Sequence, residues 1–315
     1  MVMEANVAYH KPVLCQAVVD QLVVDRTGVY LDATAGGAGH SSALLGALDE
    51  RGVLWAVDRD DDAVARVQHV LSSDARVRVR KGSFADLERL MESESIFALN
   101  GALFDLGVSS HQIDTAHRGF SYRADGPLDM RMDCEQFTTA ADLVAKASEE
   151  DLLRILRDYG EERQAKGIAK TIVRQRQEKR FETTADLRRA VEVTRPQMLN
   201  KTLARVFQAL RIAVNGELEQ LTAGLCAAVN RLTLGGRVAV IAYHSLEDRI
   251  VKQFMAERMK GCICPPRMPV CACGKKPEFA KVGRGRIRPS EDEVAHNSRA
   301  RSAILRVYEK IEGNT

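Results

Sequence analysis

Short apolar runs alternate with longer amphipathic stretches in the first third of the chain. The apolar runs predict strands at residues 28–32, 52–58 and 101–105, and the apolar–polar alternation at 77–80 predicts another. The amphipathic stretches predict helices at residues 41–48 and 60–71. Because strands that alternate with helices at this spacing form βαβ units, this part of the chain predicts a mostly parallel sheet.

The pattern changes after residue 105. Residues 106–133, which contain Gly107, Gly119, Gly126 and Pro127, predict loops, and three helix starts of the form S/T-x-x-D follow. These starts pair Thr139 with Asp142, Ser148 with Asp151, and Thr183 with Asp186. Because the hydroxyl at each start can accept a hydrogen bond from the first helical turn, we predict an all-helical segment that extends to about residue 211.

The alternating pattern then returns. It predicts a helix at 216–232, a turn at Gly235-Gly236 and a strand at 237–243. The fold class is therefore predicted to be α/β, a Rossmann-like sheet with an inserted all-helical domain. We place the first part of the α/β domain at 1–112, the insertion at 113–212 and the second part at 213–315.

Composition narrows the class of protein. A chain of 315 residues with 45% hydrophobic and 28% charged residues is globular and long enough for roughly two domains, so disordered and fibrous classes are excluded. No stretch approaches the roughly 18 apolar residues of a membrane span, and the first residues do not resemble a secretory signal. We therefore expect a cytoplasmic protein without membrane association, whose seven cysteines stay reduced or bind metal.

Charge is unevenly distributed along the chain. The whole chain has a net charge of +3, which indicates no particular partner. Residues 161–211, however, contain 13 Lys and Arg against 6 Asp and Glu, a net charge of +7, and residues 275–289 contain six basic residues against Glu278. Basic runs can be simply solvated surfaces. Two such regions beside a cofactor-type domain favour a polyanionic partner such as nucleic acid.

The first predicted strand leads into a glycine-rich turn that suggests a nucleotide-type cofactor. The dinucleotide fingerprint G-x-G-x-x-G requires a spacing that Gly36, Gly37 and Gly39 do not have. S-adenosylmethionine instead carries a cationic amino group, a carboxylate and a ribose. A site for it needs a carboxylate near the end of the first strand and bare backbone at the turn, and Asp32 and the glycines supply both.

Three further positions extend this prediction. Asp58 ends the second strand and can accept hydrogen bonds from both ribose hydroxyls, or alternatively caps the helix near residue 60. Phe84 follows the third strand, where an adenine ring would lie, or belongs to the core. Because ligands bind beyond the carboxyl ends of such strands, the segment from Asp105 to Gln112 should face the transferable group.

Several long sequence blocks closely resemble the RsmH/MraW family of S-adenosylmethionine-dependent 16S ribosomal RNA methyltransferases. The blocks are HKPVL at 10–14, DATAGGAGH at 32–40, DLGVSS at 105–110, RGFSYRADGPLDMRMD at 118–133, YGEER at 159–163, RVFQALR at 205–211, YHSLEDR at 243–249 and RPS at 288–290.

The resemblance implies a methyltransferase sheet with a helical insertion that helps to hold RNA. It implies methyl transfer to N4 of a cytidine in the decoding region (P site) of 16S rRNA within the small ribosomal subunit. The family's cofactor contacts match Ala38, Gly39, His40, Asp58, Phe84, Asp105 and Gln112. One departure is His111, where the family often has proline. Loss of the proline ring would loosen the turn. The imidazole of His111 would then lie near the base or stay at the surface.

The chemistry indicates which residues could act on the substrate. The N4 lone pair of cytosine is delocalised into the ring, so the enzyme must orient the amine in line with the methyl group. Asp105, Ser109 and Ser110 could accept the amino hydrogens as charge develops. His244, just beyond the last predicted strand, is a further candidate for the base pocket, although such histidines often only cap turns.

Four cysteines form a local cluster. Cys262, Cys264, Cys271 and Cys273 could close a tetrahedral zinc site, but the usual spacing is C-x-x-C and here it is C-x-C. A loop with reduced cysteines is the alternative, and from the sequence alone we assign no metal ligand.

Two other functions remain open from the residues. The chain could be a nucleic-acid-binding protein with a vestigial cofactor fold and a small zinc module, or a methyltransferase that acts on DNA or another RNA. The series Asp32, Gly39, Asp58 and Asp105 argues against lost cofactor binding. Oligomeric state cannot be predicted from the sequence.

Overall fold

The computed structural model describes residues 12–265, 270 and 272–312. These residues divide into two compact units. A sheet unit comprises the chain up to Gly107 and from Leu218 onward, and a helical unit comprises Val108–Glu217. The predicted insertion, 113–212, lies within the helical unit, which begins five residues earlier and ends five residues later than predicted.

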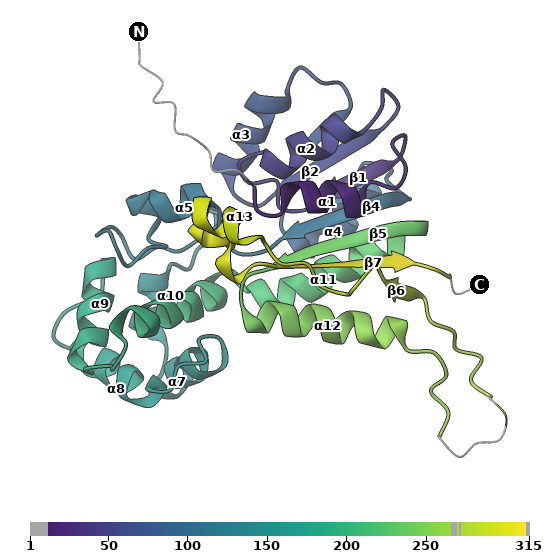
Figure 1. The fold of residues 1–315 in the computed structure, drawn as a ribbon. Coiled ribbons are helices and arrows are strands. Elements are labelled where there is room, and N and C mark those ends of the chain that lie inside the picture. The colour runs from purple at the N-terminus through teal and green to yellow at the C-terminus, as the bar shows by residue number, and fades with distance from the viewer. Residues whose placement is uncertain (1–11, 266–269, 271, 313–315) are drawn as a thin grey trace, which may run out of the picture. The chain divides into compact units, whose positions relative to one another are not determined.

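The sheet unit contains a seven-stranded sheet in the order β3-β2-β1-β4-β5-β7-β6 (Figure 1). Strands β1 to β5 are parallel, β7 runs antiparallel to β5, and β6 runs antiparallel to β7. The strands are β1 (Val29–Asp32), β2 (Val53–Asp58), β3 (Val77–Lys81), β4 (Leu99–Asp105), β5 (Leu232–Ala242), β6 (Phe279–Lys281) and β7 (Ile304–Lys310). The mostly parallel α/β sheet predicted from the sequence is confirmed.

Helices cover both faces of this sheet. The helices of the sheet unit are α1 (Cys15–Leu22), α2 (Gly39–Ala47), α3 (Asp61–Leu71), α4 (Leu87–Ser93), α11 (Glu217–Arg231), α12 (Ser245–Met259) and α13 (Glu291–His296). Side chains alternate along β2: Trp55 packs in the core with α4, α11 and α12, whereas Leu54 packs in the core with α1, α2 and α3. This alternation explains why the strands read as continuous apolar runs, since both faces are buried.

One predicted turn is wrong. The turn expected at Gly235-Gly236 lies inside β5, where the register against β4 shifts between Leu99 and Gly101. Gly235 has a φ of 76°. Across this shift β4 advances from Leu99 to Gly101 while β5 advances from Leu232 to Arg237, three residues more. Extra residues in one strand of a pair produce a bulge, and glycine adopts its left-handed backbone without strain. The glycine pair therefore bends a strand instead of ending one.

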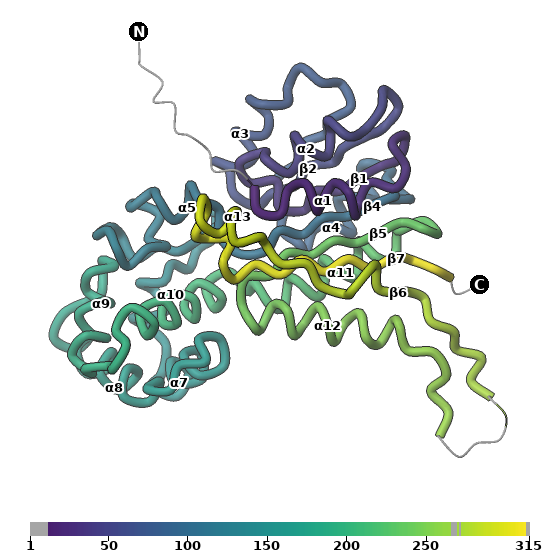
Figure 2. Tube along the Cα trace, viewed as in Figure 1, coloured from purple at the N-terminus to yellow at the C-terminus, as the bar shows by residue number. Residues whose placement is uncertain are grey.

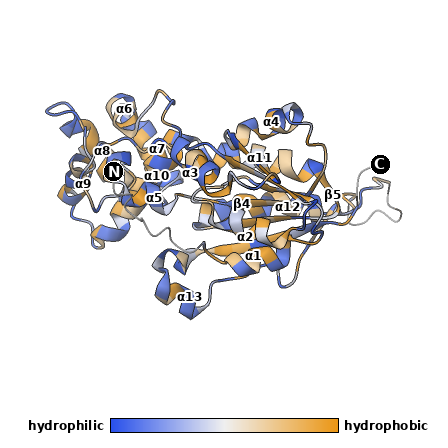
Figure 3. Cartoon of the chain, turned by 90° about the horizontal axis from the view of Figure 1, so that it is seen from above, coloured by the Kyte–Doolittle hydropathy of each residue, from blue (hydrophilic) through white to orange (hydrophobic). Residues whose placement is uncertain are grey.

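The helical unit is built from amphipathic helices around its own apolar core. They are α5 (Ser110–Asp114), α6 (Ala140–Lys146), α7 (Glu149–Asp158), α8 (Ala165–Gln175), α9 (Thr184–Val193) and α10 (Leu199–Asn215). Figure 3 shows hydrophobic and hydrophilic residues interleaved along them. The predicted hydroxyl caps are confirmed at Thr139, Ser148 and Thr183, each of which accepts a hydrogen bond from the backbone N–H three residues later. Within the described residues, no helix is long and apolar enough to cross a membrane.

Candidate active site

The turn after β1 has a constrained backbone that only small residues fit. Ala38, immediately before α2, has a left-handed backbone with a φ of 70°, and Gly36 has a φ of 48°. A Cβ on Gly39 would lie 3.0 Å from the ring of Pro12, so the turn packs against Pro12. Among the described residues, no side chain caps the first turn of α2. Its backbone N–H groups are therefore suited to an anion such as an amino acid carboxylate.

Asp32 stabilises this turn through hydrogen bonds. Its carboxylate is fully buried and accepts hydrogen bonds from the Ser41 hydroxyl at 2.6 Å and from the Thr34 N–H at 3.1 Å. Burial raises the pKa of Asp32. Because Asp32 has no exposed surface, a direct contact with a cofactor would require its neighbours to move. The structure therefore favours a positioning role, and the predicted contact stays a prediction.

Asp58 joins the end of β2 to the glycine turn. One carboxylate oxygen accepts from the Gly36 N–H at 2.8 Å, and the other accepts from the Asp60 N–H at 2.9 Å. Burial raises the pKa of Asp58 to about 6. The helix α3 is capped by Asp60, which accepts from the Asp62 N–H, so Asp58 is not the cap. The remaining lone pairs of Asp58 suit the ribose hydroxyls predicted for it.

Phe84 follows β3 and is partly buried. Its ring meets Phe104 on β4 edge to face, with 5.3 Å between ring centroids. A Cβ on Gly224 of α11 would lie 2.7 Å from the Cβ of Phe84, so α11 approaches this position closely. Phe84 thus packs at the edge of the core and also presents apolar surface. The adenine contact stays a prediction.

Asp105 at the end of β4 lies beside His40. The His40 Nε2 is 3.4 Å from one Asp105 oxygen, an ion-pair distance without hydrogen-bond geometry. Burial alone lowers the pKa of His40, but Asp105, Cys15 and Asp32 more than offset this and raise it to about 10. The histidine is 5% exposed and therefore buried as a cation. A cofactor contact at this position would come from its backbone, not from its ring.

Tyr243, a residue that our sequence interpretation passed over, contacts Asp105 directly. Its hydroxyl donates a hydrogen bond of 2.9 Å to the second Asp105 oxygen. Burial, reinforced by the Asp105 charge, raises the pKa of Tyr243. The strand order explains this contact, because β4 and β5 are parallel neighbours with Asp105 opposite Ile241. Residues just past Ile241 must then lie near Asp105.

His244 acts as a helix cap. It is the N-cap of α12 and forms a capping box with Glu247, whose N–H lies 3.5 Å from His244 Nδ1. Its Nε2 lies 3.0 Å from a Glu247 oxygen, without the geometry of a hydrogen bond. The base-pocket role predicted for His244 stays a prediction, while Tyr243 occupies the position beside Asp105.

The predicted residues after β4 belong to the helical unit. Ser109 caps α5 by accepting from the Gln112 N–H at 3.2 Å, and Gln112 returns a hydrogen bond by accepting from the Ser109 N–H at 2.9 Å. Ser110 is the first residue of α5 and is half-buried. His111 is the second residue of this helix, where proline is equally compatible because first-turn N–H groups need no helical partner.

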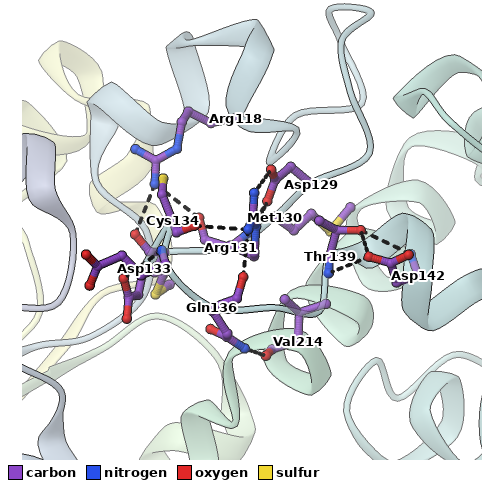
Figure 4. Close-up of polar contacts among 12 residues, drawn as sticks. Arg118, Asp129, Met130, Arg131, Asp133, Cys134, Gln136, Thr139, Asp142 and Val214 are labelled. Carbon is purple, nitrogen blue, oxygen red and sulfur yellow. Dashed lines mark hydrogen bonds and ion pairs between the residues drawn. The ribbon is translucent and has the colours of Figure 1, made fainter.

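The longest of the family-like blocks, 118–133, is an ordered loop. Arg118 is 5% exposed and donates to the carbonyl oxygens of Arg131 at 3.0 Å and Met132 at 3.1 Å (Figure 4). Asp129 pairs with the Arg131 guanidinium at 2.7 Å. Because buried polar groups fix its shape, this loop presents its exposed side chains on a rigid support.

The residues of the sheet unit fit S-adenosylmethionine chemically. The carboxyl ends of β1, β2 and β4 carry Asp32, Asp58 and Asp105. Carboxylates suit a ligand with a sulfonium and an ammonium group as well as a diol, while the uncapped turn of α2 suits its carboxylate. Asp32 and Asp58 both have raised pKa values through burial, so a cationic ligand would stabilise their ionised forms.

Comparison with known proteins places this geometry in a family. The model of the MraW methylase family matches residues 7–311. A protein of Trichlorobacter lovleyi named "Ribosomal RNA small subunit methyltransferase H" is 47% identical over 96% of this chain and 98% of its own length. A protein of the same name from Heliobacterium modesticaldum is 46% identical over 97% and 99%.

Solved structures were also compared. A structure described as a putative rRNA-methylase from Clostridium thermocellum has a TM-score of 0.44 at 12% identity, covering 95% of this chain and 94% of that one. The family match spans nearly the whole chain, so the sheet unit is that of a methyltransferase that uses S-adenosylmethionine, and the chain belongs to the MraW methylase family.

Proposed function

We propose that this protein transfers a methyl group from S-adenosylmethionine to N4 of a cytidine in the decoding region (P site) of 16S rRNA, within the small ribosomal subunit in the cytoplasm. The observation that carries this proposal is the match to relatives named "Ribosomal RNA small subunit methyltransferase H", at 42–47% identity over nearly the whole chain. The family-like blocks at 10–14 and 288–290 both lie within the residues 7–311 that the family model matches.

The sheet unit would hold the cofactor with residues already described. S-adenosylmethionine supplies an activated methyl group. Asp58 would accept hydrogen bonds from the ribose, Phe84 would contact the adenine, and the turn at Ala38 and Gly39 would receive the carboxylate end. Asp32 would act as a positioning residue for this turn, because its carboxylate is fully buried and bonds Ser41 and Thr34 within it.

Asp105 would act on the nucleophile. The amino nitrogen of cytosine must be held in line with the methyl group, and a fixed acceptor does this best when its own orientation is constrained. His40 contacts one oxygen of Asp105 and Tyr243 bonds the other, so the carboxylate is held from two sides. Its side chain nevertheless remains 23% exposed and can accept a substrate hydrogen. We give lower priority to a substrate or cofactor contact by Ser109, Ser110, Gln112 and His244. Three of these, Ser109, Gln112 and His244, already take part in helix caps.

The helical unit would hold RNA through a basic stripe on α8. Lys166, Lys170 and Arg174 are exposed and lie four residues apart, so they share one side of the helix. Other cations of the same unit, such as Arg154 and Arg157, sit beside acids that partly neutralise them. The basic stripe is therefore the part of the positively charged insertion best suited to phosphate contact, which positions RNA without reading sequence.

Aromatic and amide groups offer contacts for unstacked bases on the same unit. A cavity of about 240 Å³ is lined by Tyr122, Arg123, Arg188 and Asn200. Phe137 is 98% exposed. Aromatic rings and guanidinium planes stack on bases that have left a helix, as a target cytidine must to be reached at N4.

A transfer assay tests the proposal across substrate classes. Purified protein and methyl-labelled S-adenosylmethionine are incubated with small subunits that lack the modification, with protein-free 16S rRNA, and with duplex DNA. We expect label in small subunits, at a level that Asp105→Ala abolishes while the variant retains its fold by circular dichroism. Preferential labelling of DNA, or undiminished transfer by Asp105→Ala, would overturn the proposal.

A further inference from the structure

Residues 260–278 connect α12 to β6, and the described residues of this excursion lie outside all three apolar cores. Figure 2 follows its described parts. Ile263 and Val270 on this excursion are 57% and 75% exposed. Its described residues contact the sheet unit through Lys275, which donates to the Glu257 carbonyl at 3.2 Å, Lys276, which pairs with Glu312 at 2.6 Å, and the Glu278 N–H, which donates to the Arg258 carbonyl at 2.9 Å. Because the described apolar residues of this loop face solvent, hydrophobic packing does not order it, and another interaction is needed.

Three thiol groups converge in this excursion. The sulfur atoms of Cys262, Cys264 and Cys273 all lie within 4.8 Å of one another, and those of Cys262 and Cys273 are 3.7 Å apart. Sulfur ligands that share a tetrahedral zinc ion, with Zn–S bonds of about 2.3 Å, lie about 3.8 Å from each other. A disulfide would require about 2.05 Å. The observed spacing therefore matches ligands of one ion and not a covalent bridge.

The backbone also directs N–H groups at these sulfurs. The Ile263 N–H donates to the Cys273 sulfur and the Ala272 N–H donates to the Cys264 sulfur, each at 3.4 Å. Each donor is the middle residue of one C-x-C pair, and each acceptor belongs to the other pair. Such bonds stabilise thiolates, which are the metal-binding form of cysteine, and donors around the sulfurs are typical of metal sites.

We propose that Cys262, Cys264 and Cys273 bind one soft divalent cation, of the class of Zn²⁺, as a structural site. Three thiolates select a thiophilic ion over Mg²⁺ or Ca²⁺, which prefer oxygen ligands. Cys271 lies outside the described residues, and no role is assigned to it. The sequence prediction assigned no metal because the C-x-C spacing is atypical. The structure changes this, since Cys273 lies beside Cys262 and Cys264.

Metal content of the full chain tests the proposal. Protein is purified under reducing conditions without added metal, and bound zinc is measured by mass spectrometry before and after incubation with Zn²⁺ and removal of the excess. We expect about one equivalent per chain, with affinity for Zn²⁺ reduced by more than about 100-fold in Cys262→Ser, Cys264→Ser and Cys273→Ser. Cys134→Ser, which removes an exposed cysteine from the helical unit, is the matched control and should retain the metal.

A second readout needs no variant. Co²⁺ bound by thiolates gives a sulfur-to-cobalt charge-transfer band, and a bound ion protects its ligands from alkylation. We expect that band in the unsubstituted protein, with Zn²⁺ slowing alkylation of the three cysteines but not of Cys134. Less than about a tenth of an equivalent of zinc after incubation would overturn the proposal. So would equal alkylation with and without Zn²⁺, equal loss of metal from Cys134→Ser, or a Cys262–Cys273 disulfide in the reduced preparation.

Discussion

Asp105 illustrates how single residues set the chemistry of this protein. Its neighbours differ in kind: His40 contributes a positive charge, whereas Tyr243 contributes a hydrogen bond whose donor cannot ionise easily because its pKa is raised. The sequence identified Asp105 and His40 from a strand end and a turn. It did not identify Tyr243, because only the pairing of β4 with β5 brings these residues together, and His244 next to it has the more obviously chemical side chain.

Removing the Tyr243 hydroxyl should reduce the rate of methyl transfer and spare cofactor binding. A hydrogen bond to a charged group contributes about 1.5–3 kcal/mol, so we expect Tyr243→Phe to lower kcat by roughly 10- to 100-fold. The dissociation constant for S-adenosylmethionine, measured by calorimetry, should change less than about threefold. Tyr30→Phe is the control, since its hydroxyl bonds the backbone around Asp25. Normal kcat in Tyr243→Phe would refute this role.

Asp58 should make cofactor binding depend on pH. Its pKa in the free protein is raised to about 6 by burial, and it must be ionised to accept hydrogen bonds from ribose. The affinity for S-adenosylmethionine should therefore be nearly constant above pH 7 and fall about tenfold between pH 7 and pH 5. Calorimetric titration across this range is the measurement. In Asp58→Asn the affinity should be weaker throughout, with this pH dependence gone, and an unchanged profile would exclude Asp58 as its origin.

The stabilisation that the His40 charge gives the fold is lost as the pH rises, whereas that of a paired carboxylate is lost as the pH falls. The folded pKa of His40, about 10, lies above its ordinary value of 6.5. The stabilisation from its charge is then fully present below about pH 6.5 and lost as the pH rises through 10. Stability near neutral pH thus includes the contact of His40 with Asp105.

At the scale of elements, local patterns predicted regular structure well and irregular structure poorly. The caps at Thr139, Ser148 and Thr183 depend only on residues three apart, so the sequence shows them directly. The bulge at Gly235 and the ordered loop 118–133 depend on groups distant in the chain. Arg118, for example, is buried because it binds the carbonyl oxygens of Arg131 and Met132. The sequence pattern does not show these partners.

Gly119 should be essential to the ordered loop. Its φ is 74°, and a Cβ there would lie 2.3 Å from the Pro127 carbonyl oxygen and 2.7 Å from the Asp129 nitrogen. We expect Gly119→Ala to lower the free energy of unfolding by at least about 2 kcal/mol, measured by urea denaturation. Gly167→Ala, in the open part of α8, should instead raise it by about 0.5–1 kcal/mol. Similar effects of the two substitutions would contradict this view of the loop.

The basic stripe on α8 should contribute most of the salt-dependent part of binding by the helical unit. Replacing Lys170 and Arg174 by glutamine removes two phosphate contacts, so the slope of log affinity against log salt should decrease by about 1.5–2. Binding to small subunits at several salt concentrations is the measurement. The control replaces Arg154 and Arg157 of α7, which already lie beside acids. If the control lowers the slope as much, phosphate contact is not localised to α8.

For the whole molecule, the sequence predicted an α/β sheet interrupted by helices because each part has a distinct periodicity. It could not place the cysteines, since the approach of Cys262 to Cys273 depends on how a loop folds back on itself. A net charge of +3 likewise concealed the +7 of residues 161–211. The molecule combines a cofactor unit whose strand ends are acidic with a helical unit whose exposed cations suit RNA.

The central claim is that this combination produces N4-methylcytidine in 16S rRNA. The most direct measurement is nucleoside analysis by mass spectrometry of 16S rRNA from small subunits that lack the modification, after incubation with this protein and S-adenosylmethionine. The account predicts the appearance of N4-methylcytidine with the unsubstituted protein and its absence with Asp105→Ala. Methylation at another atom or base, or no methylation by a protein that binds S-adenosylmethionine, would contradict it.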